Sequence, residues 1–190
     1  QSVPERELHL LELHGGVGVI GLSLMQSLCH WEEKRKVRLI STDENPNCGR
    51  LFSQNAGRIL DKADDSQEAG FLPLHASKAL KQLASGRGDE RPFDAEVLIM
   101  DPPRRGLARR SVRQGLQGGQ EDVAAILASN VQGILYMSCG HRSFMRDAEL
   151  LTNGRAKGVP FRLIELKCYD MFPFTQHIET LGIFVRQTRR

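Results

Sequence analysis

The order of predicted secondary structure elements is the feature that most constrains the fold. Apolar segments typical of strands alternate with segments of helical spacing along most of the chain. The predicted strands of this part are 8–13, 37–42, 71–74, 95–100 and 133–137. The predicted helices are 18–31, 47–60, 77–84, 120–129 and 142–151. Alternation of this kind predicts an α/β fold in which a mostly parallel sheet carries helices on both faces.

The end of the chain departs from this alternation. Two further strands, 161–169 and 178–186, are separated only by the short segment DMFPFTQH. A connection this short cannot form a parallel crossover, so we expect the last of seven strands to run antiparallel. Such a strand begins at the edge where the parallel strands end, which is also where ligands bind in parallel sheets. Loops are predicted at 85–92, 117–120 and 152–160.

Length and charge bound the class of protein. A chain of 190 residues with 40% hydrophobic content can form one domain, 1–190, with a substantial core. The formal net charge of +3 does not by itself indicate a polyanionic partner. Basic residues are nevertheless clustered, at the end of the chain in RQTRR and at Arg104, Arg105, Arg109, Arg110 and Arg113. Such clusters can meet phosphates, although a solvated arginine-rich loop is equally consistent with the sequence.

Cysteine spacing indicates the redox environment. The four cysteines form no CxxC pair and lie far apart, at Cys29, Cys48, Cys139 and Cys168. This argues against a zinc site or a disulfide framework and favours a reducing compartment, with cytoplasm and organelle left open. No apolar run approaches the roughly 20 residues that span a bilayer, so no membrane partner is expected. The start, QSVPERELH, is neither a signal peptide nor an initiator context, which predicts a piece of a longer protein.

A glycine-rich turn follows the first predicted strand, in LELHGGVGVIGL (11–22). Gly15, Gly16 and Gly18 remove side chains where the chain passes from strand to helix, so a ligand can approach the backbone. Glu12 stands just before this turn. An ordinary tight turn would explain the glycines equally simply.

An acidic residue ends the second predicted strand, in STDENP (41–46). A carboxylate at this position can hold the two hydroxyls of a ribose, and Asp43 is favoured over Glu44 for this role. Together with the glycine-rich turn, this residue predicts a cofactor that contains adenosine. The alternative is an acid that caps the following helix.

Four more reactive side chains are predicted to gather at the same edge. Asp101 ends the fourth strand and is followed by two prolines that stiffen the backbone. Cys139 follows the fifth strand, and His177 and Glu179 stand at the start of the antiparallel strand. If the fourth and fifth strands are neighbours, Asp101 and Cys139 are expected about 5 Å apart. A free cysteine that caps the core is the alternative for Cys139.

Four motifs in this order resemble a known family, the S-adenosylmethionine-dependent RNA methyltransferases that make 5-methyluridine in transfer and ribosomal RNA. The motifs are LELHGGVGVIGL (11–22), DPPRRGL (101–107), YMSCG (136–140) and DMFPFTQHIE (170–179). The first is shared by many methyltransferases, whereas the other three in this order are quite specific. The resemblance extends over nearly all 190 residues.

The resemblance implies a Rossmann-like class I methyltransferase fold and S-adenosylmethionine as cofactor. The residues it places at the cofactor are Glu12, Gly15, Gly16, Gly18, Asp43 and Asp101. It further implies that Cys139 is the nucleophile, that Glu179 is the general base, and that Asp101 also contacts the target uracil. The partner would be transfer or ribosomal RNA with a single-stranded or loop uridine. Arg104, Arg105 and Arg109 would contact the RNA.

The chain departs from the family pattern at three places. Most members have Asn-Pro after the nucleophile, where this chain has Gly140-His141. The first glycine motif usually carries Tyr or Phe followed by Cys, where this chain has His14-Gly15. The family also has an RNA-binding portion and a cofactor-contacting segment before the first strand. We therefore expect the upstream RNA-binding parts to belong to a longer protein.

Methylation of uridine at carbon 5 is the function that the sequence predicts, and two alternatives stay open. The first is a degenerate methyltransferase fold that binds RNA or protein as a scaffold, for example with ribosomal or assembly partners, without turnover. The presence of Asp101, Cys139 and Glu179 argues against this alternative, because a scaffold has no need of all three. The second is a methyltransferase for another substrate, in which Cys139 is a core thiol.

Overall fold

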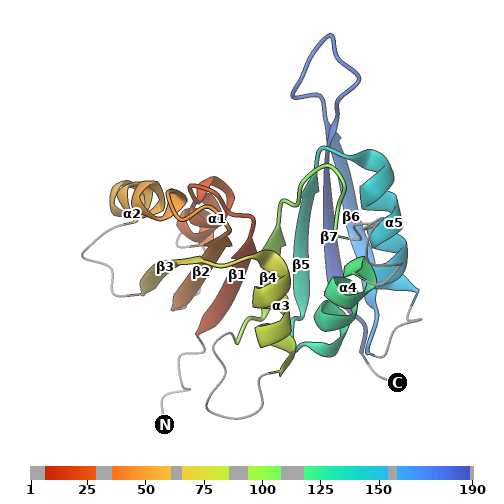
Figure 1. Cartoon of the computed structure of the whole chain (residues 1–190), viewed down its shortest axis with the longest axis horizontal. Coiled ribbons are helices and arrows are strands. Elements are labelled where there is room, and N and C mark those ends of the chain that lie inside the picture. Colours follow the sequence, from red (N-terminus) through yellow and green to blue (C-terminus); the bar gives the residue numbers. More distant parts are fainter. Residues whose placement is uncertain are drawn as a thin grey trace.

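The structure, a computed structural model, describes residues 7–28, 36–60, 66–85, 94–107, 118–153 and 158–188. Seven strands are present in these residues: β1 Leu8–Leu13, β2 Val37–Asp43, β3 Gln67–Pro73, β4 Val97–Met100, β5 Gly133–Ser138, β6 Phe161–Tyr169 and β7 Glu179–Arg186. Five helices connect them: α1 Val19–Leu28, α2 Cys48–Ile59, α3 Ala76–Ser85, α4 Gly118–Ala128 and α5 His141–Thr152 (Figure 1).

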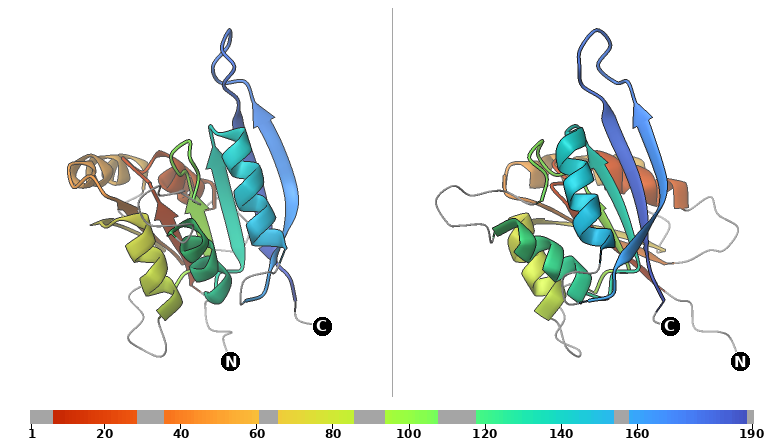
Figure 2. Two further views of the ribbon diagram at one scale, coloured as in Figure 1. Left: turned by 45° about the vertical axis from the view of Figure 1, so that its right-hand side comes forward. Right: turned by 90° about the vertical axis from the view of Figure 1, so that its right-hand side faces the viewer.

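The strands form one sheet in the order β3-β2-β1-β4-β5-β7-β6. Strand β7 is antiparallel to both of its neighbours, and the other pairings are parallel. Helices α1 and α2 cover one face of the sheet, and α3, α4 and α5 cover the other (Figure 2). The predicted fold class, including the antiparallel last strand, is confirmed.

The core has two parts, one on each face of the sheet. Leu11, Leu13 and Met100 pack with α3, α4 and α5, whereas Leu10 and Ile99 pack with α1 and α2. Side chains alternate between the faces along a strand. The same alternation therefore predicts, for each residue at the end of a strand, whether its side chain faces α1 and α2 or faces α3, α4 and α5.

Most predicted elements differ from the observed ones by no more than two residues at an end, as in β4, which begins at Val97 instead of residue 95. Two predictions differ in more than this. Strand β3 covers Gln67–Pro73 instead of 71–74, because backbone pairing with β2 extends to Val37↔Gln67 in an edge strand whose side chains are mostly exposed. The predicted loop at 117–120 is wrong for its last three residues, since α4 begins at Gly118. Packing of Val123 and Ile126 in the core stabilises this helix despite its glycines.

Some predicted segments lie outside the described residues. These are the end of the first predicted helix at 29–31, most of the loop at 85–92, and the middle of the loop at 152–160. Within the described part of the chain, no helix is long and apolar enough to cross a membrane.

The hairpin between β6 and β7 extends beyond the rest of the sheet (Figure 1). It leaves the sheet at the edge where β1, β2, β4 and β5 end. Strand β7 begins at this edge with Glu179 and ends with Arg186 at the opposite one. The two ends of β7 can therefore not serve the same site.

Candidate active site

The glycine-rich turn after β1 is shaped by close contact with its neighbours. A Cβ atom on Gly15 would collide with the Ser41 hydroxyl and lie 2.6 Å from a carboxylate oxygen of Glu12. Gly16 has a φ of +54°, which favours glycine, and nothing lies within 4 Å of the position its Cβ would take. The backbone at Gly16 is therefore open to a ligand, while at Gly15 it is tightly packed.

The Glu12 carboxylate supports this turn from beneath. It is 1% exposed and accepts hydrogen bonds from the Ser41 hydroxyl at 2.6 Å and the Gly21 amide at 2.8 Å. Burial raises the pKa of Glu12, and the two hydrogen bonds partly offset this increase. The charge of Asp101 raises the pKa of Glu12 further. Glu12 thus links β1, β2 and α1 under the turn and lies within electrostatic reach of Asp101.

Asp43 holds the outer side of the same turn. One oxygen of its carboxylate accepts a hydrogen bond from the Gly16 amide at 3.1 Å, and the other accepts one from the Asn45 amide at 2.9 Å. The alternative acid, Glu44, is exposed and lies 3.6 Å from the His75 ring. The structure therefore brings Asp43, and not Glu44, against the glycine-rich turn.

Asp101 lies at the centre of an acidic group. It directly follows Ile99 and Met100 at the end of β4, and the alternation along the strand directs it to the α1–α2 side. Partial desolvation raises the pKa of Asp101, although the residue remains exposed at the site edge. Its charge in turn raises the pKa of both Glu12 and Glu179, so Asp101 lies within electrostatic reach of both carboxylates.

Cys139 and Glu179 are brought together by antiparallel pairing. The last pair of β5 and β7 is Ser138↔Thr180, so the next residues, Cys139 and Glu179, stand opposite each other just beyond it. Ser138 and Thr180 are buried. Because side chains alternate between the faces, Cys139 and Glu179 face the α1–α2 side of the sheet. Asp101 faces the same side. Residues opposite each other in such a ladder have Cα atoms about 4.5–5.5 Å apart.

The distance expected between Asp101 and Cys139 needs correction. Strands β4 and β5 are neighbours, as predicted, but their register pairs Met100 with Tyr136. Asp101 therefore stands opposite Met137, two residues before Cys139. A rise of about 3.3 Å per residue and a strand spacing of about 4.8 Å give about 8 Å instead of 5 Å.

Two charged neighbours, Asp101 and Arg104, have opposite effects on Glu179. Burial raises the pKa of Glu179, and the charge of Asp101 raises it further. The guanidinium of Arg104 acts in the opposite direction and lowers the pKa of Glu179. His177 lies apart from this group, since its ring packs edge-on against Phe172 in the hairpin, with centroids 6.4 Å apart. His177 is therefore part of the hairpin and not of the acidic group.

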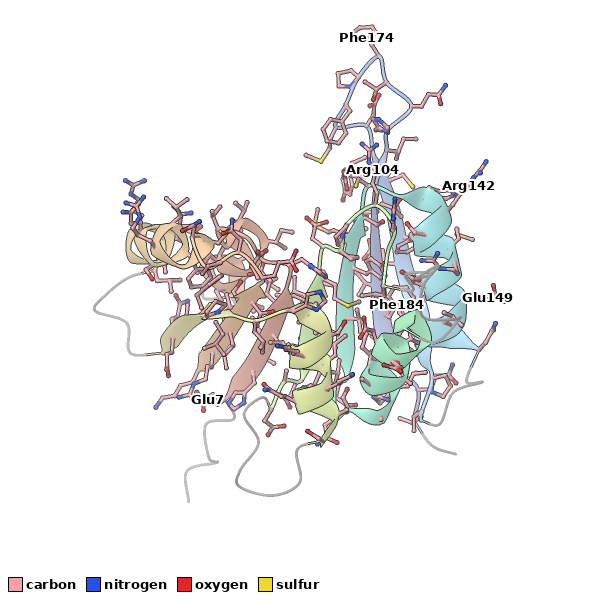
Figure 3. The ribbon with its side chains drawn as sticks, in the orientation of Figure 1. Glu7, Arg104, Arg142, Glu149, Phe174 and Phe184 are labelled. Carbon is pink, nitrogen blue, oxygen red and sulfur yellow. The ribbon has the colours of Figure 1, made fainter. Side chains whose placement is uncertain are left out.

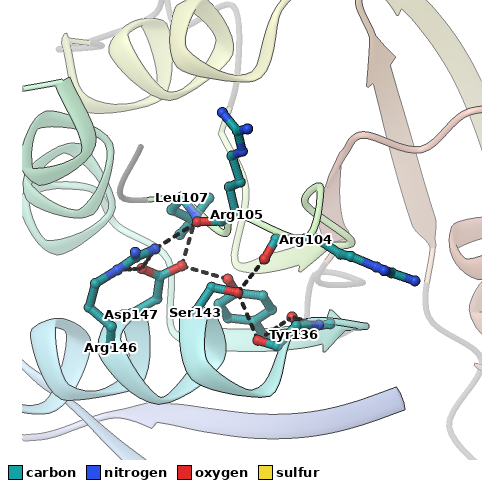
Figure 4. A network of polar contacts seen from close by, with 9 residues as sticks. Arg104, Arg105, Leu107, Tyr136, Ser143, Arg146 and Asp147 are labelled. Carbon is teal, nitrogen blue, oxygen red and sulfur yellow. Dashed lines mark hydrogen bonds and ion pairs between the residues drawn. The ribbon is translucent and has the colours of Figure 1, made fainter. Parts of the chain in front are cut away.

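A buried carboxylate positions the loop that carries Asp101 and Arg104. Oδ2 of Asp147 in α5 accepts hydrogen bonds of 2.7 Å from the Leu107 amide and from the Tyr136 hydroxyl (Figure 4). Burial, followed by the charge of Asp147, raises the pKa of Tyr136 far above its usual range. Tyr136 therefore stays protonated and keeps donating. Arg146 completes the cluster with a contact of 3.1 Å to Asp147.

Helix α5 also binds the backbone of this loop. The Ser143 hydroxyl donates to the Arg104 carbonyl at 2.5 Å, and the Arg146 guanidinium donates to the Arg105 carbonyl at 2.7 Å. With its carbonyl held, the Arg104 side chain points away from this network (Figure 4). In Figure 3 it lies at the foot of the hairpin. The sequence analysis missed these α5 residues. The available signal was Asp147 on the helix face that also carries Phe144 and Leu151.

The residue after Cys139 is glycine for a steric reason. A Cβ atom at Gly140 would collide with the Arg104 carbonyl and lie 2.5 Å from the Ser143 hydroxyl. The loop after β4 thus passes directly over Gly140. The asparagine that most of the resembled family has here would require this loop to move.

The basic residues divide into two groups at opposite edges. Arg104 and Arg105 are exposed at the edge that carries Glu179, whereas Arg109 and its neighbours lie outside the described residues. Arg186 in RQTRR donates to the carbonyls of Val131 and Val159, and its guanidinium lies 4.3 Å from the centre of the Phe161 ring. Burial lowers the pKa of Arg186. Within the cluster RQTRR, Arg186 is therefore engaged by the protein's own backbone carbonyls and not available to phosphate, while Arg189 and Arg190 lie outside the described residues.

No group of three or more potential metal ligands occurs among the described residues. The three cysteines that the structure describes, Cys48, Cys139 and Cys168, are all free thiols.

Comparison with a solved structure identifies the class of fold. A SAM-dependent methyltransferase from Methanosarcina mazei matches with a TM-score of 0.59 at 10% sequence identity, over 98% of this chain and 95% of that chain. The chain therefore has the Rossmann-like class I methyltransferase fold.

Several curated relatives of the chain are named RNA methyltransferases. A protein of Protochlamydia amoebophila, named an uncharacterized RNA methyltransferase, is 28% identical over 178 residues, 93% of this chain and 37% of that protein. A Haemophilus ducreyi protein provisionally named 23S rRNA (uracil(747)-C(5))-methyltransferase is 26% identical over 181 residues, 94% of this chain and 69% of that protein. No protein-family model matches the chain. The resemblance to RNA methyltransferases is confirmed, and the chain spans little more than a third of the first of these relatives.

Proposed function

We propose that this chain is the catalytic domain of a S-adenosylmethionine-dependent RNA methyltransferase that methylates carbon 5 of uridine. The observation that carries this proposal is the opposition of Cys139 and Glu179 at the end of the β5–β7 ladder. Asp101 lies within electrostatic reach of Glu179, and the glycine-rich turn belongs to the same edge. The name of the Haemophilus relative supports the choice of uracil carbon 5.

The residues around the glycine-rich turn fit an adenosine-containing cofactor. Gly16 offers open backbone, and Gly15 and Gly18 allow the turn itself. Asp43 would hold the ribose hydroxyls while it keeps its hydrogen bond to the Gly16 amide. Glu12 would act mainly by positioning this turn, because its carboxylate is buried and has two donors. The cofactor would supply the methyl group.

The protein's own residues would carry the remaining chemistry. Carbon 5 of uracil is a poor nucleophile, so Cys139, after losing its proton to solvent, would add its sulfur to carbon 6 and form an enolate. The Asp101 carboxylate would bind the polar edge of the uracil ring and so hold the ring in place. Once carbon 5 carries the new methyl group, Glu179 would remove the remaining proton there. The electron pair of that C–H bond restores the ring double bond, and the C–S bond to Cys139 breaks.

This chemistry limits the substrate and its surroundings. The uridine must leave its stack to present carbon 6, so we propose a single-stranded or loop uridine in transfer or ribosomal RNA. Arg104 and Arg105 would bind phosphates at this edge, and Arg109 remains a proposed third contact. The sulfur of Cys139 must stay reduced, which is consistent with a reducing compartment. Parts that the longer relatives possess beyond the aligned region would assist RNA recruitment.

Mass spectrometry of RNA nucleosides from cells that lack the protein tests the proposal. We expect one 5-methyluridine to disappear from transfer or ribosomal RNA, and expression of the Cys139→Ala variant should not restore it. Loss of a different methylated nucleoside would indicate another substrate, with Cys139 as a core thiol. An unchanged nucleoside profile with defective ribosome assembly would instead support the scaffold function.

A further inference from the structure

The hairpin arm, residues 170–178 between β6 and β7, ends in a tight turn. The Thr175 amide donates to the Phe172 carbonyl at 3.1 Å, which makes Pro173 and Phe174 the two central residues of the turn. Phe174 has a φ of +67°. Proline at the second position and a positive φ at the third correspond to a type II turn.

Phenylalanine is an unfavourable residue for this position. The third residue of a type II turn is normally glycine or asparagine, because a Cβ atom crowds the backbone when φ is positive. The turn is nevertheless held in place. The Thr175 hydroxyl donates to the Phe172 carbonyl at 2.7 Å, and the His177 amide donates to the Thr175 hydroxyl at 3.2 Å. Strain that the surroundings enforce in this way is typical of functional positions.

The ring of Phe174 contributes no packing to the described part of the fold. The residue is fully exposed, at 106% of its reference area, and it stands at the far end of the hairpin arm (Figure 3). Phe172, in contrast, packs its ring against His177. Met171 and Ile178 are also exposed along the arm. A strained, solvent-exposed aromatic residue in this position does not stabilise the fold, so its benefit must come from a partner.

Charges around the foot of the arm indicate the chemistry of that partner. Arg104 and Arg142 are exposed at the same edge of the sheet, with Arg142 in the first turn of α5 (Figure 3). Arg105, the neighbour of Arg104 in the chain, is also exposed. The acids of this region are Asp101, Asp170 at the start of the arm and Glu179 at its foot. Exposed rings combined with arginines match single-stranded nucleic acid, in which the ring stacks on a base and the guanidinium groups bind phosphates.

We propose that Phe174 is a base-stacking residue that holds an unpaired nucleotide of the RNA beside the target uridine. This inference rests on the proposed function, because it places the stacked base next to the uridine at Cys139. Phe174 lies five residues before Glu179, so the Cα atoms of the two residues are at most about 17 Å apart even along an extended chain. That reach suits a neighbouring nucleotide of the same strand and not the target itself.

Fluorescence of a modified oligonucleotide tests the stacking directly. The probe is a short single-stranded oligouridylate that carries one 2-aminopurine, whose emission is quenched when it stacks on an aromatic ring. The wild-type chain should quench it, and Phe174→Trp should retain quenching. Phe174→Ala should remove the quenching and weaken binding about tenfold or more. Met145→Ala, an exposed apolar residue of α5, is the matched control and should bind like wild type.

Salt dependence separates stacking from phosphate contacts. Phe174→Ala should weaken binding at every salt concentration without changing the slope of log affinity against log salt. Arg104→Gln should instead reduce the magnitude of that slope by about one. Phe174→Gly adds a stability readout, because glycine relieves the positive φ. Its thermal midpoint should equal or exceed that of wild type while quenching is lost, which rules out misfolding as the cause.

The outcomes also distinguish this inference from the proposed function. Cys139→Ala should quench like wild type, since stacking needs no thiol. Quenching by Phe174 without any 5-methyluridine formation in cells would keep the inference and overturn the proposed function. Normal affinity and quenching by Phe174→Ala would overturn the inference. Sedimentation could instead show that wild-type chains associate and that Phe174→Ala abolishes this association without changing RNA affinity. That result would also overturn the inference, because Phe174 would then contact protein.

Discussion

The backbone amide of Leu107 donates a 2.7 Å hydrogen bond to Oδ2 of Asp147, whose side chain is completely buried in α5. The Tyr136 hydroxyl donates to the same oxygen. This bond joins the loop after β4 to a helix that contributes no proposed nucleophile, acid or base. The position of Asp101 and Arg104 therefore depends on a carboxylate on the other side of the sheet from the site.

Replacing Asp147 should destabilise the whole domain. Asp147→Ala leaves the Leu107 amide and the Tyr136 hydroxyl buried without this acceptor, and we expect a loss of about 3–5 kcal/mol in the free energy of unfolding. Urea denaturation followed by circular dichroism measures it. Met145→Ala, exposed on the same helix, should change the free energy by less than about 0.5 kcal/mol. Equal effects of the two variants would refute the structural role of Asp147.

Cys139 and Glu179 should fail at different steps. Cys139→Ala should abolish both methylation and any covalent RNA complex, because no bond to carbon 6 can form. Glu179→Gln keeps size and hydrogen bonding but is a far poorer base, so proton removal stalls after addition. The methylated RNA should then stay attached through Cys139 as a denaturation-resistant band on a gel. An adduct mapped by mass spectrometry to the exposed Cys168 would contradict the mechanism.

The pH dependence of proton removal should follow the surroundings of Glu179. Its pKa is raised by burial and then by Asp101, and only the ionised form is a base, so the rate should rise with pH through that pKa. Asp101→Asn removes a negative charge and should move the acid limb to lower pH. Arg104→Gln removes a positive charge and should move it to higher pH. Single-turnover release of the adduct measures the midpoint, and shifts of the opposite sign would exclude Glu179 as the base.

Asp43 should contribute to cofactor affinity, and Glu44 should not. Asp43→Ala removes a charge-assisted hydrogen bond to the ribose, and we expect binding of S-adenosylmethionine to weaken by about 1.5–3 kcal/mol in calorimetry. Part of this loss will come from the glycine-rich turn, because the variant also lacks the acceptor of the Gly16 amide. Glu44→Ala serves as the neighbouring acidic control, because its side chain is exposed. If wild type binds no cofactor at all, the scaffold function gains support.

Gly140 should be intolerant of any side chain. The methyl group of Gly140→Ala must displace the Arg104 carbonyl, which moves the loop that carries Asp101. We expect a lower kcat for uridine methylation with unchanged cofactor affinity, since the glycine-rich turn is elsewhere on the edge. Ser143→Ala removes the hydroxyl near Gly140 and the bond to the same carbonyl without adding bulk. It should therefore impair kcat less than Gly140→Ala does.

The sequence by itself determined the elements and the edge at which the functional residues gather. Hydrophobic periodicity is a local property, so the alternation of strands and helices could be read from neighbouring residues. The carboxyl ends of parallel strands share one edge, which brought Asp43, Asp101 and Cys139 to the same side without any coordinates. The short connection DMFPFTQH was enough to predict that the last strand runs antiparallel, which places Glu179 at the same edge.

Only the tertiary structure decided which strands pair and in which register. The insertion of β7 between β5 and β6 places Glu179 opposite Cys139, while the β4–β5 register shifts Asp101 two residues back. Packing also decided the fate of charged residues that look alike in the sequence. Arg186 donates its hydrogen bonds to backbone carbonyls, whereas Arg104 stays exposed at the edge that carries the site. Register and burial depend on contacts between residues distant in the chain, and local sequence patterns carry no direct record of those contacts.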